Sequence, residues 1–150
     1  ALKENAGAKL LASQPGNYQR LQALQVMENL MQSNSQIDGV LAANDAMAVG
    51  AIEALDGANR KAQVIGINGT KEAIDAIKSG KLLASGDYNG FAQGCLGTMM
   101  AIRSLRNQPV ISEIVLKPTV ITKDNYQPFD VPLEQRTCPT FEDAGKLSGK

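Results

Sequence analysis

The sequence contains no histidine and no tryptophan, and it has only two cysteines among its 150 residues. The absence of histidine removes the commonest metal ligand and the commonest general base at neutral pH. Cys95 and Cys138 lie far apart, so the C-x-x-C spacing of zinc sites and thioredoxin-like redox sites is missing. A nucleophile elbow, a P-loop lysine and a G-x-G-x-x-G motif are missing as well. We therefore expect no enzymatic activity, no metal and no cofactor.

An excess of charge of one sign is also lacking, because 15 basic residues balance 15 acidic ones. A nucleic-acid surface needs a basic excess or stripe to neutralise phosphates, so we expect no nucleic-acid partner. No apolar run approaches the roughly 20 residues that a membrane-spanning helix requires. Hydrophobic residues make up 43% and charged residues 20% of the chain, which is typical of a globular domain with one core.

Short apolar runs alternate with segments of helical periodicity over most of the chain. We expect strands at residues 8–12, 39–43, 64–67 and 82–85, and helices over residues 18–33, 45–57, 70–79 and 91–106. Continuous apolar strands that alternate with helices predict a parallel sheet covered by helices on both faces. The predicted fold class is therefore α/β.

The two ends of the chain differ from this pattern. Residues 1–7 are typical of the last turns of a helix that ends at Gly7, and we expect an upstream part of the protein to be missing. β-branched residues within 111–122 are interrupted by Pro118. Residues 124–150 are interrupted by three further prolines, which predicts a mostly irregular tail whose last few residues are disordered or vector-derived.

Polar and aromatic side chains gather in the four turns that connect a predicted strand to the following helix. They are Gln14, Asn17, Tyr18, Asn44, Asp45, Asn68, Thr70, Asp87, Tyr88 and Asn89. Ligands of open parallel sheets bind beyond the carboxyl ends of the strands, which is where these turns meet. Amides and carboxylates bond hydroxyl groups, and an aromatic ring covers C–H bonds, so the set suits a polyhydroxylated ligand.

A purely structural role is the alternative for several of these residues. Asn44 and Asp45 precede a helix, where either side chain can serve as the N-cap. Asn68 precedes Gly69, and this dipeptide is typical of a turn. Tyr18, at the start of an amphipathic helix, can pack against the protein or face a ligand.

Two segments resemble a known family. Residues 41–51, with Asn44-Asp45 followed by Met47-Ala48 and Gly50, are similar to the N-D-x-M-A-x-G segment of type I periplasmic binding proteins. Residues 64–70, Val-Ile-Gly-Ile-Asn-Gly-Thr, and the Gly-Lys-Leu-Leu-Ala-Ser run at 80–85 are similar to segments that follow in that family. From about residue 1 to residue 122 the chain resembles the carboxy-terminal halves of ribose- and pentose-binding receptors of bacterial ABC transporters.

The resemblance implies one lobe of a two-lobed fold whose lobes are joined by three crossing strands and close on a sugar. It implies a carboxy-terminal lobe at residues 1–87, a segment at 88–117 that returns to the absent amino-terminal lobe, and a last hinge crossing and tail at 118–150. It also implies a periplasmic location, a small polar ligand (a sugar, polyol or sugar acid), and a membrane permease as partner. The missing amino-terminal half would supply the remaining ligand contacts.

Carried over residue by residue, the resemblance gives roles to three side chains. Tyr18 would be the aromatic ring that faces the sugar, and Asn44 would hydrogen-bond sugar hydroxyls. Tyr88 would lie at a hinge crossing where the family often has glutamine. An arginine that the family supplies from an earlier helix would lie upstream of Ala1.

The sequence departs from the family at Asn68, where sugar receptors usually have aspartate in G-x-D-G. An aspartate only accepts hydrogen bonds, whereas an asparagine donates with one arm and accepts with the other. We therefore hypothesise a ligand with an acceptor at this position, such as a sugar acid or a carbonyl-bearing sugar. The alternative is that nearby Asp87 supplies the missing carboxylate.

The two cysteines allow two outcomes. In an oxidising periplasm Cys95 and Cys138 could form a disulfide that fastens the tail to the helix at 91–106. The alternative is a pair of free buried thiols.

A second protein class shares the fold implied by the resemblance, namely the effector-binding domain of lactose-repressor-type transcription regulators. Those regulators usually have V-P-x-D-I before the third strand, whereas residues 59–63 here are Asn-Arg-Lys-Ala-Gln. The upstream sequence separates the two classes, because a signal peptide indicates transport and a helix-turn-helix indicates regulation.

Overall fold

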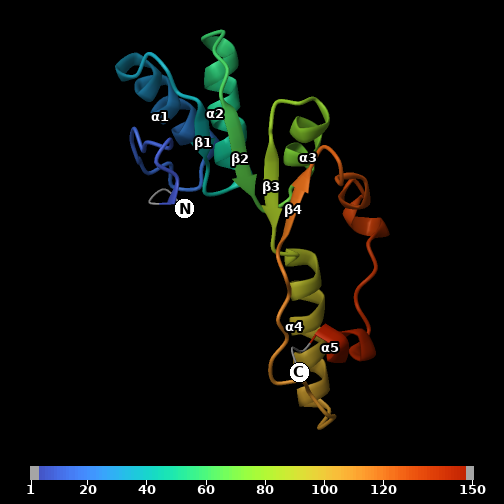
Figure 1. Cartoon of the computed structure of the whole chain (residues 1–150). Coiled ribbons are helices and arrows are strands. Elements are labelled where there is room, and N and C mark those ends of the chain that lie inside the picture. Colours follow the sequence, from blue (N-terminus) through green and yellow to red (C-terminus); the bar gives the residue numbers. More distant parts are fainter. Residues whose placement is uncertain (1–3, 148–150) are drawn as a thin grey trace.

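Short β-branched and small-residue runs form the sheet. In this computed structural model, which describes residues 4–147, the strands are β1 (Gly39–Leu41), β2 (Gln63–Ile67), β3 (Ala84–Asp87) and β4 (Thr119–Thr122). β1, β2 and β3 are parallel, β4 runs antiparallel to β3, and the strand order is β1-β2-β3-β4 (Figure 1). The predicted α/β class with a mostly parallel sheet is confirmed.

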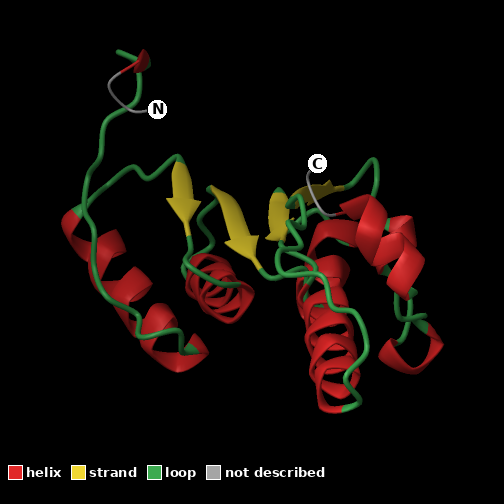
Figure 2. Cartoon of the chain, turned by 90° about the horizontal axis from the view of Figure 1, so that it is seen from below, coloured by secondary structure: helices red, strands yellow, loops and turns green. Residues whose placement is uncertain are grey.

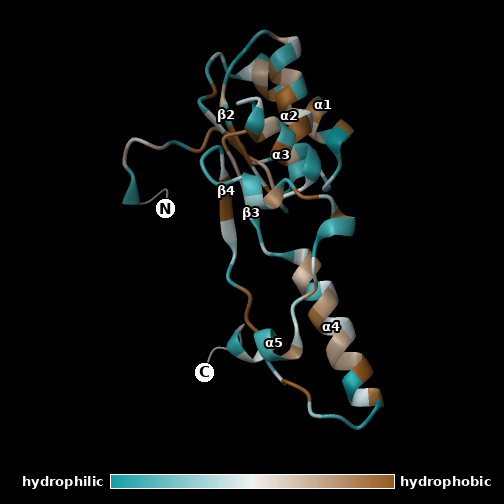
Figure 3. Ribbon diagram, turned by 90° about the vertical axis from the view of Figure 1, so that its right-hand side faces the viewer, coloured by the Kyte–Doolittle hydropathy of each residue, from teal (hydrophilic) through white to brown (hydrophobic). Residues whose placement is uncertain are grey.

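The helices are α1 (Arg20–Ser33), α2 (Asp45–Gly57), α3 (Lys71–Lys78), α4 (Gly90–Leu105) and α5 (Phe141–Leu147). Helices α1 and α2 lie on one face of the sheet (Figure 2), and α3 lies on the same side (Figure 3). On the opposite face, Leu41, Ile67 and Val120 are 79%, 43% and 63% exposed. Within residues 4–147, helices therefore cover the sheet on one face, whereas the sequence predicts helices on both.

The core lies between that covered face and the helices. Because side chains alternate along a strand, Val64 of β2 and Ile121 of β4 point toward the helices. They pack in one cluster with Ile74 and Ile77 of α3, and all four side chains are at most 1% exposed. Burying each such side chain stabilises the fold by about 1.5–3 kcal/mol.

Two predicted strands differ from the structure. The strand predicted at residues 8–12 is wrong, because the described residues offer this segment no pairing partner and Leu10 and Leu11 are 63% and 47% exposed. β3 begins at Ala84 rather than at Leu82. Leu82 is buried, but its N–H donates to the Ala76 carbonyl in the turn that ends α3 (3.1 Å). At residues 8–12 the apolar run lacks the hydrogen-bonding neighbour that a strand needs, whereas the Leu83 N–H already donates to the Val64 carbonyl of β2 (2.9 Å) just before β3 begins.

The ends of the chain also differ in part. The helix end predicted at residues 1–7 lies partly outside the described residues, and within them the Ala8 N–H closes a turn on the Asn5 carbonyl (2.9 Å). The tail contains two 3₁₀ turns, η2 (Gln127–Phe129) and η3 (Leu133–Gln135), and the unpredicted helix α5. The expectation that the last few residues are disordered or vector-derived concerns residues 148–150, which lie outside the described residues.

Helix α4 stands apart from the sheet (Figures 1 and 3). It buries Ala92 and Leu96 and packs against α5, whose Ala144 is completely buried. The chain then runs back beside α4 and re-enters the sheet as β4 (Figure 1). At the far end of α4, Ile102 and Leu105 remain 43% and 85% exposed. None of the helices described here is both long and apolar enough to cross a membrane.

The tail is attached to α3 by an ion pair that responds to acid. Asp130 Oδ2 lies 2.7 Å from Lys78 Nζ, and Lys71 Nζ lies 3.6 Å from Asp130 Oδ1, while Asp75 and the Tyr126 ring also face Lys78. The hydrogen bond from Lys78 holds the pKa of Asp130 below its ordinary value of 3.8. A group with a lowered folded pKa stabilises the fold above its unfolded pKa, and the contribution is lost as pH falls through the folded pKa.

We therefore expect this attachment to weaken in acid. After correction for intrinsic rates, amide hydrogens around η2 should exchange faster at about pH 3 than at about pH 5. An Asp130→Asn variant should exchange fast at both values. Equal protection of wild type at both values would contradict the expectation.

Candidate functional site

The turn after β1 is organised by the N-cap of α2. Asn44 Oδ1 accepts a hydrogen bond from the Met47 N–H (2.9 Å), which is the capping role that its position before a helix allows. Its Nδ2 donates to the Tyr18 carbonyl at 3.2 Å. An amide has two N–H groups and two lone pairs, so Asn44 keeps one of each for a ligand.

The Asn44 bond holds an unusual backbone in place. Asn17 and Tyr18 both have positive φ, 49° and 60°, a region that residues with side chains rarely adopt twice in succession. Such strain persists where the surroundings impose it and is concentrated at binding sites. Tyr18 is 69% exposed, so its ring is available to a ligand and does not pack in the core.

Asp45 is a buried carboxylate that lies between these turns. It is 1% exposed; Oδ1 accepts from the Ser85 hydroxyl (2.7 Å) and Oδ2 from the Thr70 N–H (2.8 Å). The close approach requires glycine at position 66, where a Cβ would overlap Asp45 Oδ1 and lie 3.1 Å from the Ala48 Cβ. Asp45 therefore cannot reach a ligand; it joins α2, β3 and the turn before α3.

The turn after β2 is held by the same Asp45–Ser85 pair. Ser85 Oγ, which donates to Asp45, accepts from the Gly69 N–H (3.0 Å), and the Asn68 N–H donates to the Gly86 carbonyl (2.9 Å). Asn68 and Gly69 have φ of 128° and 65°, the positive values that an Asn-Gly turn accommodates. The Asn68 side chain is half-buried and forms no hydrogen bond within residues 4–147, so its amide is free for a ligand.

Asp87 and Tyr88 end the third strand at the same edge. Asp87 Oδ1 accepts from the Asn89 N–H (2.8 Å), and a Cβ at Gly69 would lie 3.0 Å from the Asp87 Cβ. The Asp87 carboxylate is therefore close to the turn that carries Asn68. Tyr88 is 45% exposed and lies at the junction between β3 and α4, where its carbonyl accepts from Gln93 (2.8 Å).

The structure thus brings the five predicted side chains to one edge of the sheet. Asn44, Asn68 and Asp87 offer spare donors and acceptors, and Tyr18 and Tyr88 offer exposed rings. No group of three potential metal-ligating side chains occurs in the part of the chain described here.

A mostly parallel α/β domain with neutral amides, one carboxylate and two aromatic rings at the carboxyl edge defines a small-molecule-binding domain. Residues 1–109 match the family model described as a periplasmic binding protein domain. This chain belongs to the periplasmic binding protein family.

Named relatives agree with this assignment. The ribose import binding protein RbsB of Haemophilus influenzae is 36% identical over 76% of this chain, and the xylitol-binding protein of Mycolicibacterium smegmatis is 35% identical over 84%. A solute-binding protein of an ABC transporter from Actinobacillus succinogenes, solved with bound D-allose, superposes with a TM-score of 0.75 at 33% identity. The superposed region covers 80% of this chain and 43% of the solved chain. These relatives are binding proteins, in agreement with the expectation that the chain is not an enzyme.

The match covers only part of each relative. The chain spans 39% of the length of the ribose protein and 36% of the xylitol protein.

Proposed function

We propose that this chain is the carboxy-terminal part of a periplasmic receptor that binds a sugar, polyol or sugar acid and delivers it to the membrane permease of an ABC importer. The observation that carries the proposal is the convergence of Tyr18, Asn44, Asn68, Asp87 and Tyr88 at one sheet edge. Their backbones are held by internal hydrogen bonds, while the side chains keep free hydrogen-bonding capacity. A preorganised polar surface of this kind loses little entropy when a polyhydroxylated ligand binds.

A two-lobed architecture would complete the site. In it, residues 1–87 form one lobe, residues 88–117 belong to the amino-terminal lobe, and residues 118–150 form the last crossing and the tail. Two unpartnered apolar surfaces support this division: the open sheet face with Leu41 and Val120, and the end of α4 with Ile102 and Leu105. Neighbouring exposed apolar side chains often mark surfaces that other parts of a protein cover.

The mechanism follows from the two-lobed architecture. The turns described here contact one side of the ligand, and side chains from the amino-terminal lobe contact the other. A ligand that touches both lobes binds the closed state more tightly than the open state, so it shifts the population toward closure. The permease then recognises the closed arrangement of the two lobes.

A thermal-shift screen of sugars, polyols and sugar acids on the intact protein tests the proposal. A ligand present at 100 times its Kd stabilises the folded state by about 2.7 kcal/mol, which raises the midpoint by several degrees. We expect at least one compound of these classes to do so. No shift with any of them at millimolar concentration would contradict the proposal.

Asn68 is proposed to select the ligand within these classes. Its free amide can donate to a carboxylate or carbonyl oxygen, whereas an aspartate there would repel it. We expect Asn68→Asp to weaken binding of a sugar acid by roughly 10–100-fold, since a hydrogen bond to a charged group contributes about 1.5–3 kcal/mol. Isothermal titration of both proteins with a matched pair, a neutral sugar and its acid, measures the change.

Asp87→Asn is the matched control, because it alters the neighbouring carboxylate and leaves the Asn68 amide intact. If Asp87 binds hydroxyl donors, this variant should lose affinity for both members of the pair. An unchanged preference for neutral sugars in wild type and Asn68→Asp would eliminate the role assigned to Asn68.

A further inference from the structure

The tail beyond β4 connects two separate parts of the structure. One part, called here the sheet body, comprises β1–β4 with α1–α3. The other, the α4 body, comprises α4, α5 and the return segment at residues 106–118. The chain passes between them at residues 87–90 and again at 116–119, and the tail passes between them a third time (Figure 1).

One end of this third connection is fixed to the sheet body. Tyr126 and Phe129 are half-buried against the hydrophobic core. Asp130 then forms its ion pair with Lys78 of α3 at 2.7 Å. Both kinds of contact hold the chain at α3, on the helix-covered side of the sheet.

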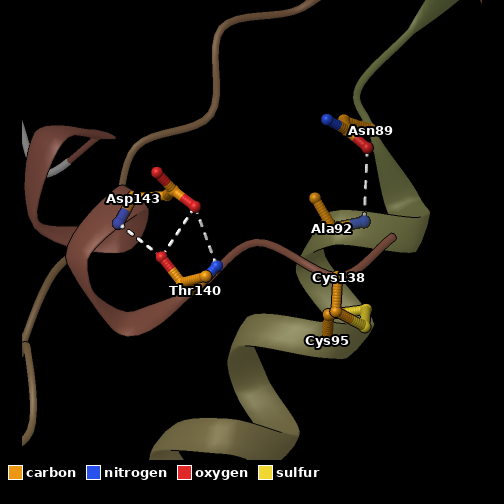
Figure 4. Close-up of a disulfide and its surroundings, with 6 residues drawn as sticks. All are labelled: Asn89, Ala92, Cys95, Cys138, Thr140 and Asp143. Atoms are coloured by element: carbon orange, nitrogen blue, oxygen red, sulfur yellow. Dashed lines mark hydrogen bonds between the residues drawn. A yellow bond between two sulfur atoms is a disulfide. The ribbon is translucent and has the colours of Figure 1, made fainter. Parts of the chain in front are cut away.

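The other end is fixed covalently to the α4 body. Cys138 forms a disulfide with Cys95 of α4, with a Cα–Cα distance of 5.6 Å (Figure 4). Beyond it, the Arg103 guanidinium carbon lies 3.7 Å from the centroid of the Phe141 ring. The disulfide therefore fixes to α4 the segment just before α5, and the cation–π contact holds the first residue of α5 against α4.

A capping arrangement makes this second anchor rigid. Thr140 Oγ1 accepts from the Asp143 N–H (3.1 Å), and Asp143 Oδ2 accepts from the Thr140 N–H (3.0 Å) and hydroxyl (2.7 Å) (Figure 4). These reciprocal bonds satisfy two N–H groups at the start of α5. The hydrogen bonds from Thr140 also hold the pKa of Asp143 below its ordinary value.

The span between the anchors, residues 130–138, is short and braced. Arg136 donates to the Val131 and Phe129 carbonyls, each at 3.1 Å, which keeps the span folded on itself. Even fully extended, the chain from Asp130 to Cys138 cannot exceed about 29 Å. The two bodies therefore cannot move apart at this side beyond that limit while both anchors hold.

We propose that residues 123–147 form a disulfide-closed strap that runs beside the hinge and limits how far the two bodies open. The inference rests on the two-lobed function proposed above, in which the α4 body belongs to the amino-terminal lobe. The strap leaves closure free, because a tether restricts extension only. Its effect falls on the ligand-free, open state.

The test compares ligand-free intact protein with two variants by small-angle X-ray scattering. Cys95→Ser combined with Cys138→Ser detaches the strap. Insertion of six glycine and serine residues between Glu134 and Gln135 keeps the disulfide and adds about 20 Å of reach. We expect both variants to have a larger radius of gyration than the wild type.

A control insertion of the same six residues between Ala58 and Asn59, in the exposed turn after α2, adds equal mass outside the strap. Its radius of gyration should stay at the wild-type value within the small increase due to mass. Equal values for all four proteins would overturn the strap, and so would two free thiols on titration of the denatured, unreduced wild type. Because no ligand is present, these outcomes are independent of the thermal-shift screen, whose failure would count against the receptor function alone.

Discussion

Replacement of Asp45 by alanine is expected to destabilise the intact protein by roughly 3 kcal/mol and to weaken ligand binding at the same time. The substitution leaves the Ser85 hydroxyl and the Thr70 N–H without the acceptor that now lies 2.7 and 2.8 Å away. It also removes the connection between the turns that carry Asn44, Asn68 and Asp87. Urea denaturation measures the stability change, and isothermal titration with a ligand from the screen measures the binding change.

Asp56→Asn is the matched control on the same helix. The Asp56 side chain is 52% exposed and pairs with Lys81 at 2.7 Å, and exposed pairs of this kind contribute less than about 1 kcal/mol. We expect this variant to keep both stability and affinity. If Asp45→Ala lowered stability but bound ligand as the wild type does, the positioning role of Asp45 would be refuted while its structural role remained.

The reason Asp45 was not predicted as a positioning residue lies in the distance between its partners along the chain. Position 45, at the start of a helix, favours a capping role. The hydrogen-bonding partner Ser85 is 40 positions away, and nothing local in Ala84-Ser85-Gly86 distinguishes a buried hydroxyl. The one available signal is Gly66, a small residue in the middle of a β-branched strand, which indicates a close approach by another group.

The elements that could be predicted are those whose signals are local. The α2 helix and its cap follow from Asn44 and the apolar spacing behind it, and the Asn68-Gly69 turn follows from the dipeptide alone. The prediction of a strand at residues 8–12 was wrong. Whether an apolar run forms a strand depends on a hydrogen-bonding neighbour elsewhere in the chain, which the local sequence does not reveal. α5 had a local signal, Thr140 three residues before Asp143, which is close to the capping-box pattern.

In the candidate site, too, some features follow from the local sequence and others depend on the fold. Residue types at the sheet edge follow from strand–turn–helix order, so the position of these five side chains at that edge could be predicted without a structure, while their contact with a ligand stays a prediction. Their remaining hydrogen-bonding capacity could not, because it depends on which bonds the fold already uses. Asn44 uses one of its two N–H groups and one of its two lone pairs on Tyr18 and Met47, whereas the Asn68 amide is free within the described residues. This difference is why Asn68, and not Asn44, is the residue assigned to ligand selection.

Gly50→Ala is expected to destabilise the protein by about 3 kcal/mol, at the upper end of the range for overpacking a close contact. Helices α1 and α2 cross at Gly50, where an added Cβ would overlap the Arg20 carbonyl oxygen and lie 3.1 Å from the Leu24 nitrogen. Both obstacles are backbone atoms, which cannot rotate away as a side chain can. Relief requires α1 to move, and α1 begins two residues after Tyr18, so the Tyr18–Asn44 bond should lengthen as well. Thermal and urea unfolding of the intact protein measure the loss.

Gly57→Ala separates this crowding from the general effect of alanine in a helix. Gly57 ends the same helix, and a Cβ there meets nothing within 4 Å. Alanine restricts the unfolded chain more than glycine does, so this variant should equal or exceed the wild-type stability by up to about 1 kcal/mol. A loss of stability in Gly50→Ala together with a gain in Gly57→Ala would be explained by the helix crossing alone. If Gly50→Ala were as stable as Gly57→Ala, α1 would not approach α2 as closely as described.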